Sequence, residues 1–220
     1  MNRRTLLIAC MVLLAAYMAG NAATGTKMLA CANAATSAAT IVVAQNASDI
    51  ASIEAYSRQM DAYTKRNARA GRLFGDTANY EDANAPARWK EFKTKSALQR
   101  AEVYSAATAW LNSTGELVVA DFSLSSPSGD WAQFNTYYYR GDGTLAKLHS
   151  ELRTFMGDVV VIRDRFYDPN GKLLQEKTRY LDLQTRKPKK VKEGDFQDMP
   201  IELYAKTSDL PFYALVKKGR

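Results

Sequence analysis

The chain has 220 residues, of which 46% are hydrophobic and 24% are charged, and its formal net charge is +7 at neutral pH. This balance excludes an intrinsically disordered chain and suits one domain behind a targeting segment. The positive charge is modest for a nucleic-acid-binding protein and is spread along the sequence, so no nucleic-acid partner is expected.

Residues 1–22 have the layout of a secretory signal peptide. Arg3 and Arg4 supply positive charge, residues 6–20 form an uncharged apolar run, and Ala22 is a small residue suited to a cleavage site. The run is short for a membrane span, so we expect an exported, periplasmic or secreted protein without a transmembrane segment in its mature chain. An uncleaved signal that anchors the protein is the alternative.

Residues 23–47 are rich in Ala, Thr and Ser, which predicts a flexible leader in front of a single α+β domain at 48–220. Cys31 lies in this leader and would be the one cysteine of a processed chain, so no intramolecular disulfide is expected. Because residues 28–31 look like a poor bacterial lipid-attachment signal, an envelope protein anchored by a lipid on Cys31 is an alternative.

An amphipathic helix is predicted over residues 49–70, before Gly71. Its apolar residues recur at steps of three or four and form one stripe. They are Ile50, Ile53, Tyr56, Met60 and Tyr63. A stripe of this kind packs on other elements, and we expect the helix to cover the apolar face of a sheet.

Residues 75–97 follow a less regular pattern. Pro86 interrupts this stretch, and a short helix is predicted after it. Trp89 and Phe92 are the apolar residues expected to anchor that helix to the domain.

Between about residue 100 and residue 183, glycines recur every fourteen residues, with runs rich in Val, Thr, Tyr, Phe and Leu between them. The glycines are Gly115, Gly129, Gly143, Gly157 and Gly171. Ten strand residues and a four-residue turn account for a step of fourteen. The sequence therefore predicts an antiparallel up-and-down β-meander of about six strands, covered by the N-terminal helix.

The turns alternate between two classes, so the full period is twenty-eight residues. In one class an aromatic residue enters the turn and a leucine follows two positions after the glycine. Residues 168–171 suit a type I turn that ends in a left-handed glycine.

Residues 140–142 are Arg-Gly-Asp, an adhesion signal of some extracellular proteins, and they occupy the corresponding positions of a sister turn. Turn chemistry explains them, and an adhesion ligand is the alternative.

Strand alternation predicts one apolar face and one charged face. The charged side chains are candidates for ligand binding because arginine binds phosphate or carboxylate through two parallel hydrogen bonds. These candidates are His149, Glu151, Arg153, Arg163, Arg165 and Arg179. The alternative is a solvated surface with cross-strand ion pairs.

Signatures of catalysis and of cofactor binding are missing from the sequence. His149 is the one histidine, so no metal site is expected, and no phosphate-binding glycine loop or nucleophile motif occurs. We therefore expect no cofactor and favour a protein that is not an enzyme. The alternative is an enzyme of unrecognised type that uses His149, Glu151 and Arg153 as an acid–base group.

Two features complete the domain. Residues 186–192 form the densest basic cluster, interpreted as a solvated loop or as a contact with anionic lipid headgroups. Residues 199–216 are too apolar to be free, which predicts a tail docked on the domain. The sequence thus favours an exported, non-enzymatic binding or structural module of the bacterial cell envelope, with an anionic component or a lipid-like molecule as its ligand.

Overall fold

The computed structural model describes residues 49–82, 85–192 and 194–218. Contacts within the chain separate Met1–Ala47 from Ser48–Arg220. The expected signal peptide, leader and lipid site lie outside the described residues.

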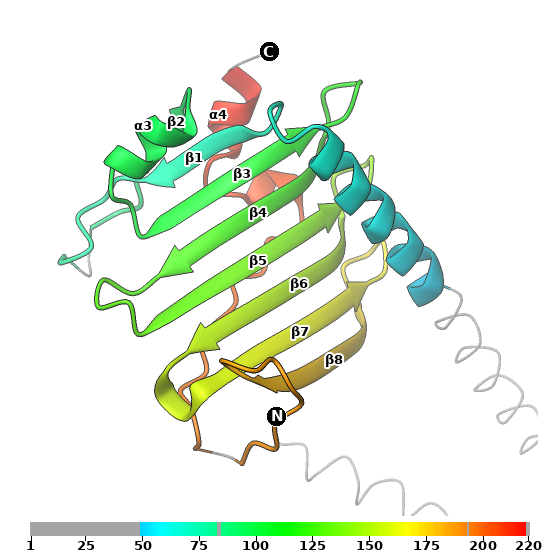
Figure 1. The fold of residues 1–220 in the computed structure, drawn as a ribbon. Coiled ribbons are helices and arrows are strands. Elements are labelled where there is room, and N and C mark those ends of the chain that lie inside the picture. The colour runs from blue at the N-terminus through cyan, green and yellow to red at the C-terminus, as the bar shows by residue number, and fades with distance from the viewer. Residues whose placement is uncertain (1–48, 83–84, 193, 219–220) are drawn as a thin grey trace, which may run out of the picture. The chain divides into compact units, whose positions relative to one another are not determined.

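The second unit is mostly one antiparallel sheet of eight strands with a few helices (Figure 1). Within the described ranges, no helix is long and apolar enough to cross a membrane.

The strands follow one another across the sheet in the order β2-β1-β3-β4-β5-β6-β7-β8. They are β1 (Arg72–Asp76), β2 (Trp89–Phe92), β3 (Ser105–Leu111), β4 (Leu117–Ser125), β5 (Trp131–Tyr139), β6 (Leu145–Thr154), β7 (Val159–Tyr167) and β8 (Leu173–Asp182). The helical segments are residues 49–66, α3 (Lys95–Arg100), α4 (Tyr213–Lys218) and the 3-10 turns η1 (Met156–Asp158) and η2 (Thr207–Asp209). Strands β3 to β8 form the meander that the glycine spacing predicts.

Two strands were not expected from the sequence. Trp89 and Phe92, expected on a short helix, lie at the two ends of β2, and the helix begins later, at Lys95. The hydroxyl of Thr94 caps α3 by accepting the amide of Ala97 at 3.1 Å, which explains why the helix begins there. Together β1 and β2 raise the strand count from the expected six to eight.

The periodic glycines adopt the backbone conformation that their turns require. All five have φ between +74° and +84°, where a Cβ atom would clash with the backbone. At Gly143, for example, the amide donates to the carbonyl of Arg140 at 2.9 Å and closes the turn. At Gly157 a Cβ atom would lie 2.5 Å from the carbonyl oxygen of Asp195, so that glycine also permits a close backbone approach.

The longer period of twenty-eight residues corresponds to three β-bulges. The pairing shifts by one residue at the end of β3, of β5 and of β7, where each meets the next strand. The extra residues are Val118, Ala146 and Leu174, and all three pack on the side of the helix at 49–66. Simple alternation assigns Ala146 to the same face as Leu148, and the bulge moves it to the other.

The helix at 49–66 crosses the ends of these bulged strands (Figure 1). The hydroxyl of Tyr63 donates to the carbonyl of Leu111 at 2.6 Å, and that of Tyr56 donates to the carbonyl of Tyr139. Tyr56 and Tyr63 are seven residues apart, which is a rise of about 10.5 Å along the helix. The strand ends that they contact, on β5 and β3, are two strands apart, or about 9.6 Å. The spacing of the tyrosines therefore matches the spacing of the carbonyls that the bulges expose.

The third carbonyl of this series, that of Tyr167, accepts a hydrogen bond from Arg140 at 2.6 Å. Arg140 also donates to the carbonyl of Leu145 at 2.7 Å, and burial lowers the pKa of its guanidinium. Asp142 accepts from the amide of Thr144 at 2.9 Å. Both charged side chains of the Arg-Gly-Asp tripeptide thus stabilise the turn, as the turn interpretation predicts.

The C-terminal segment packs on the tail face, our name for the apolar side of the sheet that includes Phe74, Phe122, Tyr137 and Leu148. Phe212 is fully buried there and stacks on Phe74 with ring centroids 4.4 Å apart. The hydroxyl of Tyr137 donates to the carbonyl of Glu202 at 2.6 Å. Aromatic packing and backbone hydrogen bonds together hold the tail in place.

The helix was expected on an apolar face of the sheet, and its contacts lie on the side opposite the tail. Ile53 packs with Ala146 and Phe166, and Tyr138 on the same side donates to Asp61 at 2.7 Å. The physical reason is that the tail supplies the aromatic side chains that fill the tail face. The helix instead pairs its tyrosine hydroxyls with strand ends, which alternation within strands does not reveal.

Candidate functional site

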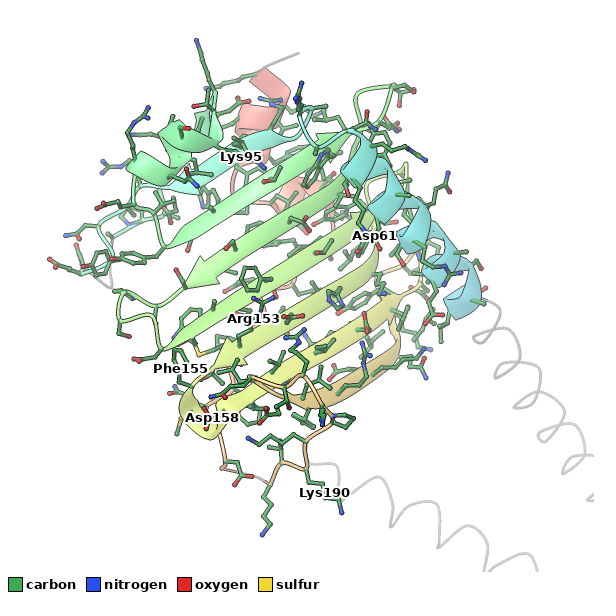
Figure 2. The ribbon with its side chains drawn as sticks, viewed as in Figure 1. Asp61, Lys95, Arg153, Phe155, Asp158 and Lys190 are labelled. Carbon is green, nitrogen blue, oxygen red and sulfur yellow. The ribbon has the colours of Figure 1, made fainter. Side chains whose placement is uncertain are left out.

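A row of polar side chains crosses the sheet on the face opposite the tail. Cross-strand pairs join Thr108 to Asp121, Asp121 to Thr136, Thr136 to His149, and His149 to Asp164. Directly paired residues of antiparallel strands project to the same side, so these five side chains are neighbours. We call this surface the open face, because Figure 2 shows it uncovered between the helix at 49–66 and α3.

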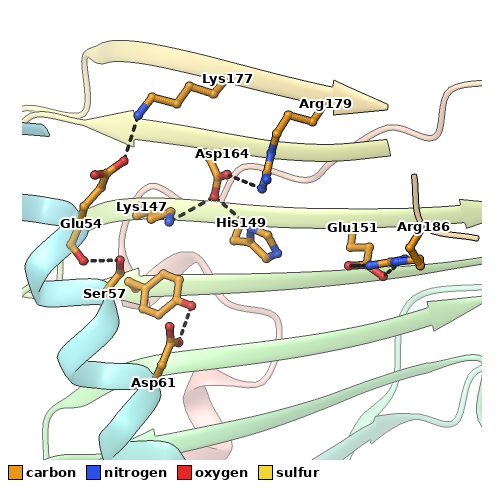
Figure 3. Close-up of polar contacts among 11 residues, drawn as sticks. Glu54, Ser57, Asp61, Lys147, His149, Glu151, Asp164, Lys177, Arg179 and Arg186 are labelled. Atoms are coloured by element: carbon orange, nitrogen blue, oxygen red, sulfur yellow. Dashed lines mark hydrogen bonds and ion pairs between the residues drawn. The ribbon is translucent and has the colours of Figure 1, made fainter. Parts of the chain in front are cut away.

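Asp164 is the charged centre of the open face (Figure 3). Its carboxylate lies 3.1 Å from Nζ of Lys147, 2.9 Å from Nδ1 of His149 and 3.8 Å from the guanidinium of Arg179. Burial alone would raise the pKa of Asp164, but the hydrogen bonds and charges of His149 and Lys147 hold it at about 2. The carboxylate therefore stays ionised and fixes the imidazole through Nδ1.

Glu151 is held by two arginines. Arg153 donates from Nε at 2.6 Å, and both terminal nitrogens of Arg186 donate at 3.0 Å. Burial works to raise the pKa of Glu151, but these partners lower it overall. His149 and Glu151 thus have separate partners, and the structure does not bring them together as an acid–base pair.

The four candidate arginines lie on two faces of the sheet. Arg153 and Arg179 are on the open face, whereas Arg163 and Arg165 pair with Ser150 and Leu148 and lie on the tail face. There Arg163 donates to Asp198 at 2.7 and 2.8 Å, and Arg165 donates to Glu176 at 2.7 Å. Alternation orders the side chains within a strand, but only the pairing register relates one strand to the next.

Arg153 lies over an aromatic ring that lines a cavity. Its guanidinium carbon is 4.7 Å from the ring centroid of Phe134, which is cation–π distance. Phe134 also lines a cavity of about 470 Å³ beside α3. The side chain of Arg153 is 50% exposed and that of Arg179 is 62% exposed, so both guanidinium groups are accessible to a ligand.

Asp121 faces the same cavity and was not singled out from the sequence. Its Oδ1 is buried and has no hydrogen-bond partner among the described residues. Burial raises the pKa of Asp121, while a hydrogen bond from the hydroxyl of Thr136 opposes this in part. One signal was available in the sequence, because Asp121 is the one charged residue of the strand "LVVADFSLS".

The basic segment at 186–192 is partly structural. Arg186 holds Glu151, as described above, and Nζ of Lys189 donates to the carbonyls of Gly157 and Asp158 at 2.7 and 3.0 Å. Lys187 is exposed. Two of the cations that the sequence presents as a charge cluster therefore fasten this loop to the sheet.

Among the described residues, no group of three or more His, Cys, Asp or Glu side chains is arranged to hold a metal ion. The open face carries cations, hydroxyl groups and, at Asp121, a carboxylate oxygen without a hydrogen-bond partner among the described residues. Comparison of the chain with protein-family models, with curated proteins and with solved structures finds no match.

Proposed function

We propose that the protein is an exported, non-enzymatic binding module of the bacterial cell envelope, whose open face takes an anionic, amphiphilic ligand. One observation carries this proposal. The guanidinium of Arg153 rests on the ring of Phe134, and that ring lines the cavity beside α3. A positive charge with free donors therefore lies over a ring that lines a cavity with both apolar and polar residues.

The anionic group would bind at the exposed arginines. Arg153 engages Glu151 through Nε, which leaves its terminal nitrogens to donate, and Arg179 is 3.8 Å from its nearest acidic partner. Guanidinium groups bind carboxylates and phosphates through parallel, charge-assisted hydrogen bonds. His149 adds a third donor or acceptor at Nε2, because Nδ1 is engaged by Asp164.

The apolar part of the ligand would enter the cavity. Leu98 and Val103 supply one wall and Phe134 another. Ligand sites of small molecules usually combine such apolar linings with a few polar groups that fix orientation. This arrangement favours binding over catalysis, because Glu151 and His149 are each engaged by partners of their own.

The test compares two detergents that share one alkyl chain. Titration calorimetry should give heat for dodecyl phosphate and little for dodecyl maltoside, both below their micelle concentrations. Arg153→Gln should weaken binding of dodecyl phosphate about tenfold, the value of one charge-assisted hydrogen bond. Arg165→Gln is the matched control on the tail face. Equal affinity for the two detergents, or no change in Arg153→Gln, would refute the proposal.

Export is tested separately in a bacterial host. Fractionation should recover the protein from the periplasm or medium, with a mass that lacks residues 1–22. The mass of the Cys31→Ser variant is then compared with that of the original protein. If the two masses differ only by the replacement of sulfur by oxygen, Cys31 carries no lipid. Recovery of the uncleaved chain in the membrane fraction would favour the anchored alternative.

A further inference from the structure

Strands β4, β6 and β7 present three carboxylates on the open face, and one of them lacks a cation. Asp164 lies beside Lys147, His149 and Arg179, as Figure 3 shows. Glu151 is bound by two arginines. Asp121 has no ion-pair partner among the described residues, although it is part of the same polar row.

The surroundings of Asp121 disfavour its charge. Burial and the charge of Asp61 raise the pKa of Asp121. His149 lies next but one to Asp121 in the polar row, and its Nδ1 is engaged by Asp164. An ionised group that is removed from water without a partner destabilises the folded state. The polar row therefore holds a carboxylate that no cation of the described residues pairs with, and its Oδ1 has no hydrogen-bond partner among them.

The space in front of Asp121 suits a cationic group. The cavity of about 470 Å³ includes the hydroxyls of Thr108, Ser123 and Thr136 next to the carboxylate. An ammonium group has three donors and no acceptor, and these oxygens are acceptors.

We propose that this cavity binds the ammonium group of a small amine with an apolar body, with Asp121 as its counter-ion. Threonine and serine hydroxyls complete the hydrogen bonds of the ammonium, while Leu98 and Val103 contact the apolar body. The inference does not depend on the anionic contact at Arg153. Where both sites are filled by one molecule, that ligand is zwitterionic.

The experiment uses the full chain and three probes of one shape: benzylamine, benzyl alcohol and benzoate. Binding is followed at neutral pH by the amide shifts of Asp121, Phe134 and Thr136 in ¹H–¹⁵N spectra. Benzylamine should saturate these shifts at a concentration at least tenfold lower than either other probe. An equal or higher affinity for benzyl alcohol or benzoate would overturn the proposal.

Asp121→Asn keeps the shape of the side chain and removes its charge. It should weaken benzylamine binding at least tenfold, whereas Asp198→Asn, which removes an acid on the tail face, should leave the affinity unchanged. Unchanged binding in Asp121→Asn would overturn the proposal.

If Asp121→Asn misfolds, a pH titration of the original protein still tests the proposal. The titration midpoint of the ¹³C carboxyl signal of Asp121 should move to lower pH when benzylamine is present, because a bound cation stabilises the carboxylate. A midpoint that does not move contradicts the assignment. Loss of dodecyl phosphate binding in Arg153→Gln reports on the other contact, so the two proposals fail independently.

Discussion

The two faces of the sheet are built on different principles. On the tail face, Phe74, Phe122 and Phe212 pack into a closed aromatic cluster in which every ring touches another. On the open face, Asp164 and Glu151 are compensated by cations that remain partly exposed. Burial of aromatic rings contributes far more to stability than partly exposed ion pairs do. The fold therefore depends mainly on the tail face, while the open face is free to carry charges.

The largest expected effect tests the tail face. Phe212→Ala should lower the free energy of unfolding by about 3–5 kcal/mol, because it empties a fully buried site between the tail and the sheet. Urea denaturation followed by tryptophan fluorescence measures this. Phe155→Ala is the control, because Phe155 is 66% exposed and its loss should cost less than about 0.5 kcal/mol. Similar losses in the two variants would contradict the comparison.

A smaller loss is expected from the charged centre of the open face. Asp164→Asn should lower the free energy of unfolding at neutral pH by about 2 kcal/mol, since the pKa of Asp164 is held at about 2 instead of 3.8. Because that pKa is depressed, the stabilisation is present above the ordinary aspartate pKa and disappears as the pH falls from about 4 to about 2. The stability curves of the two proteins against pH should converge there. Curves that stay parallel would show that the loss has another cause.

The contact between the helix and the sheet should be weaker still. Tyr56→Phe removes the hydrogen bond to the carbonyl of Tyr139 and keeps the ring, which should cost about 1 kcal/mol. Hydrogen exchange of the amides at 49–66 should accelerate, while that of β7 should not. Tyr80→Phe, at a side chain that is 55% exposed, is the control. Unchanged exchange at 49–66 would mean that the hydroxyl does not hold the helix.

The smallest effect has the opposite sign. Asp121→Asn should raise the free energy of unfolding at neutral pH by about 1 kcal/mol, because it removes a partly buried charge that has no ion-pair partner among the described residues. The pKa of Asp121 is raised, so the folded protein favours its protonated form, and the gain should vanish near pH 3, where the carboxyl is protonated in both states. Thermal unfolding at the two pH values measures this. A loss of stability at neutral pH would show that Asp121 has a partner after all.

The meander could be predicted because each of its turns carries its own signal. Gly143 and Gly171 mark the turns, and the runs between them have the length and composition of strands. Strands β1 and β2 were not predicted because they have only five and four residues, and the sequence around them shows no regular pattern. The side of the sheet that the helix at 49–66 covers depends on contacts between segments far apart in the sequence, which local patterns do not encode.

The candidate site could be predicted only in part, for a similar reason. The sequence identified His149, Glu151 and Arg153 as one face of a strand, and they do share the open face. The sequence also grouped Arg163 with these three residues, although Arg163 lies on the tail face. Alternation within one strand does not show which side chains of the neighbouring strand lie on the same face. Asp121 was overlooked because its significance lies in a missing partner, which becomes visible only when every neighbour is known.

The helix at 49–66 is long enough to reach across all three bulges of the sheet. Its 18 residues span about 27 Å, whereas the bulges at Val118, Ala146 and Leu174 extend over about 19 Å. A fourth unit of twenty-eight residues would place its bulge about 29 Å from the first, beyond the end of the helix. On this spacing, a sheet with one more pair of strands would need about six more helical residues for the helix to reach every bulge.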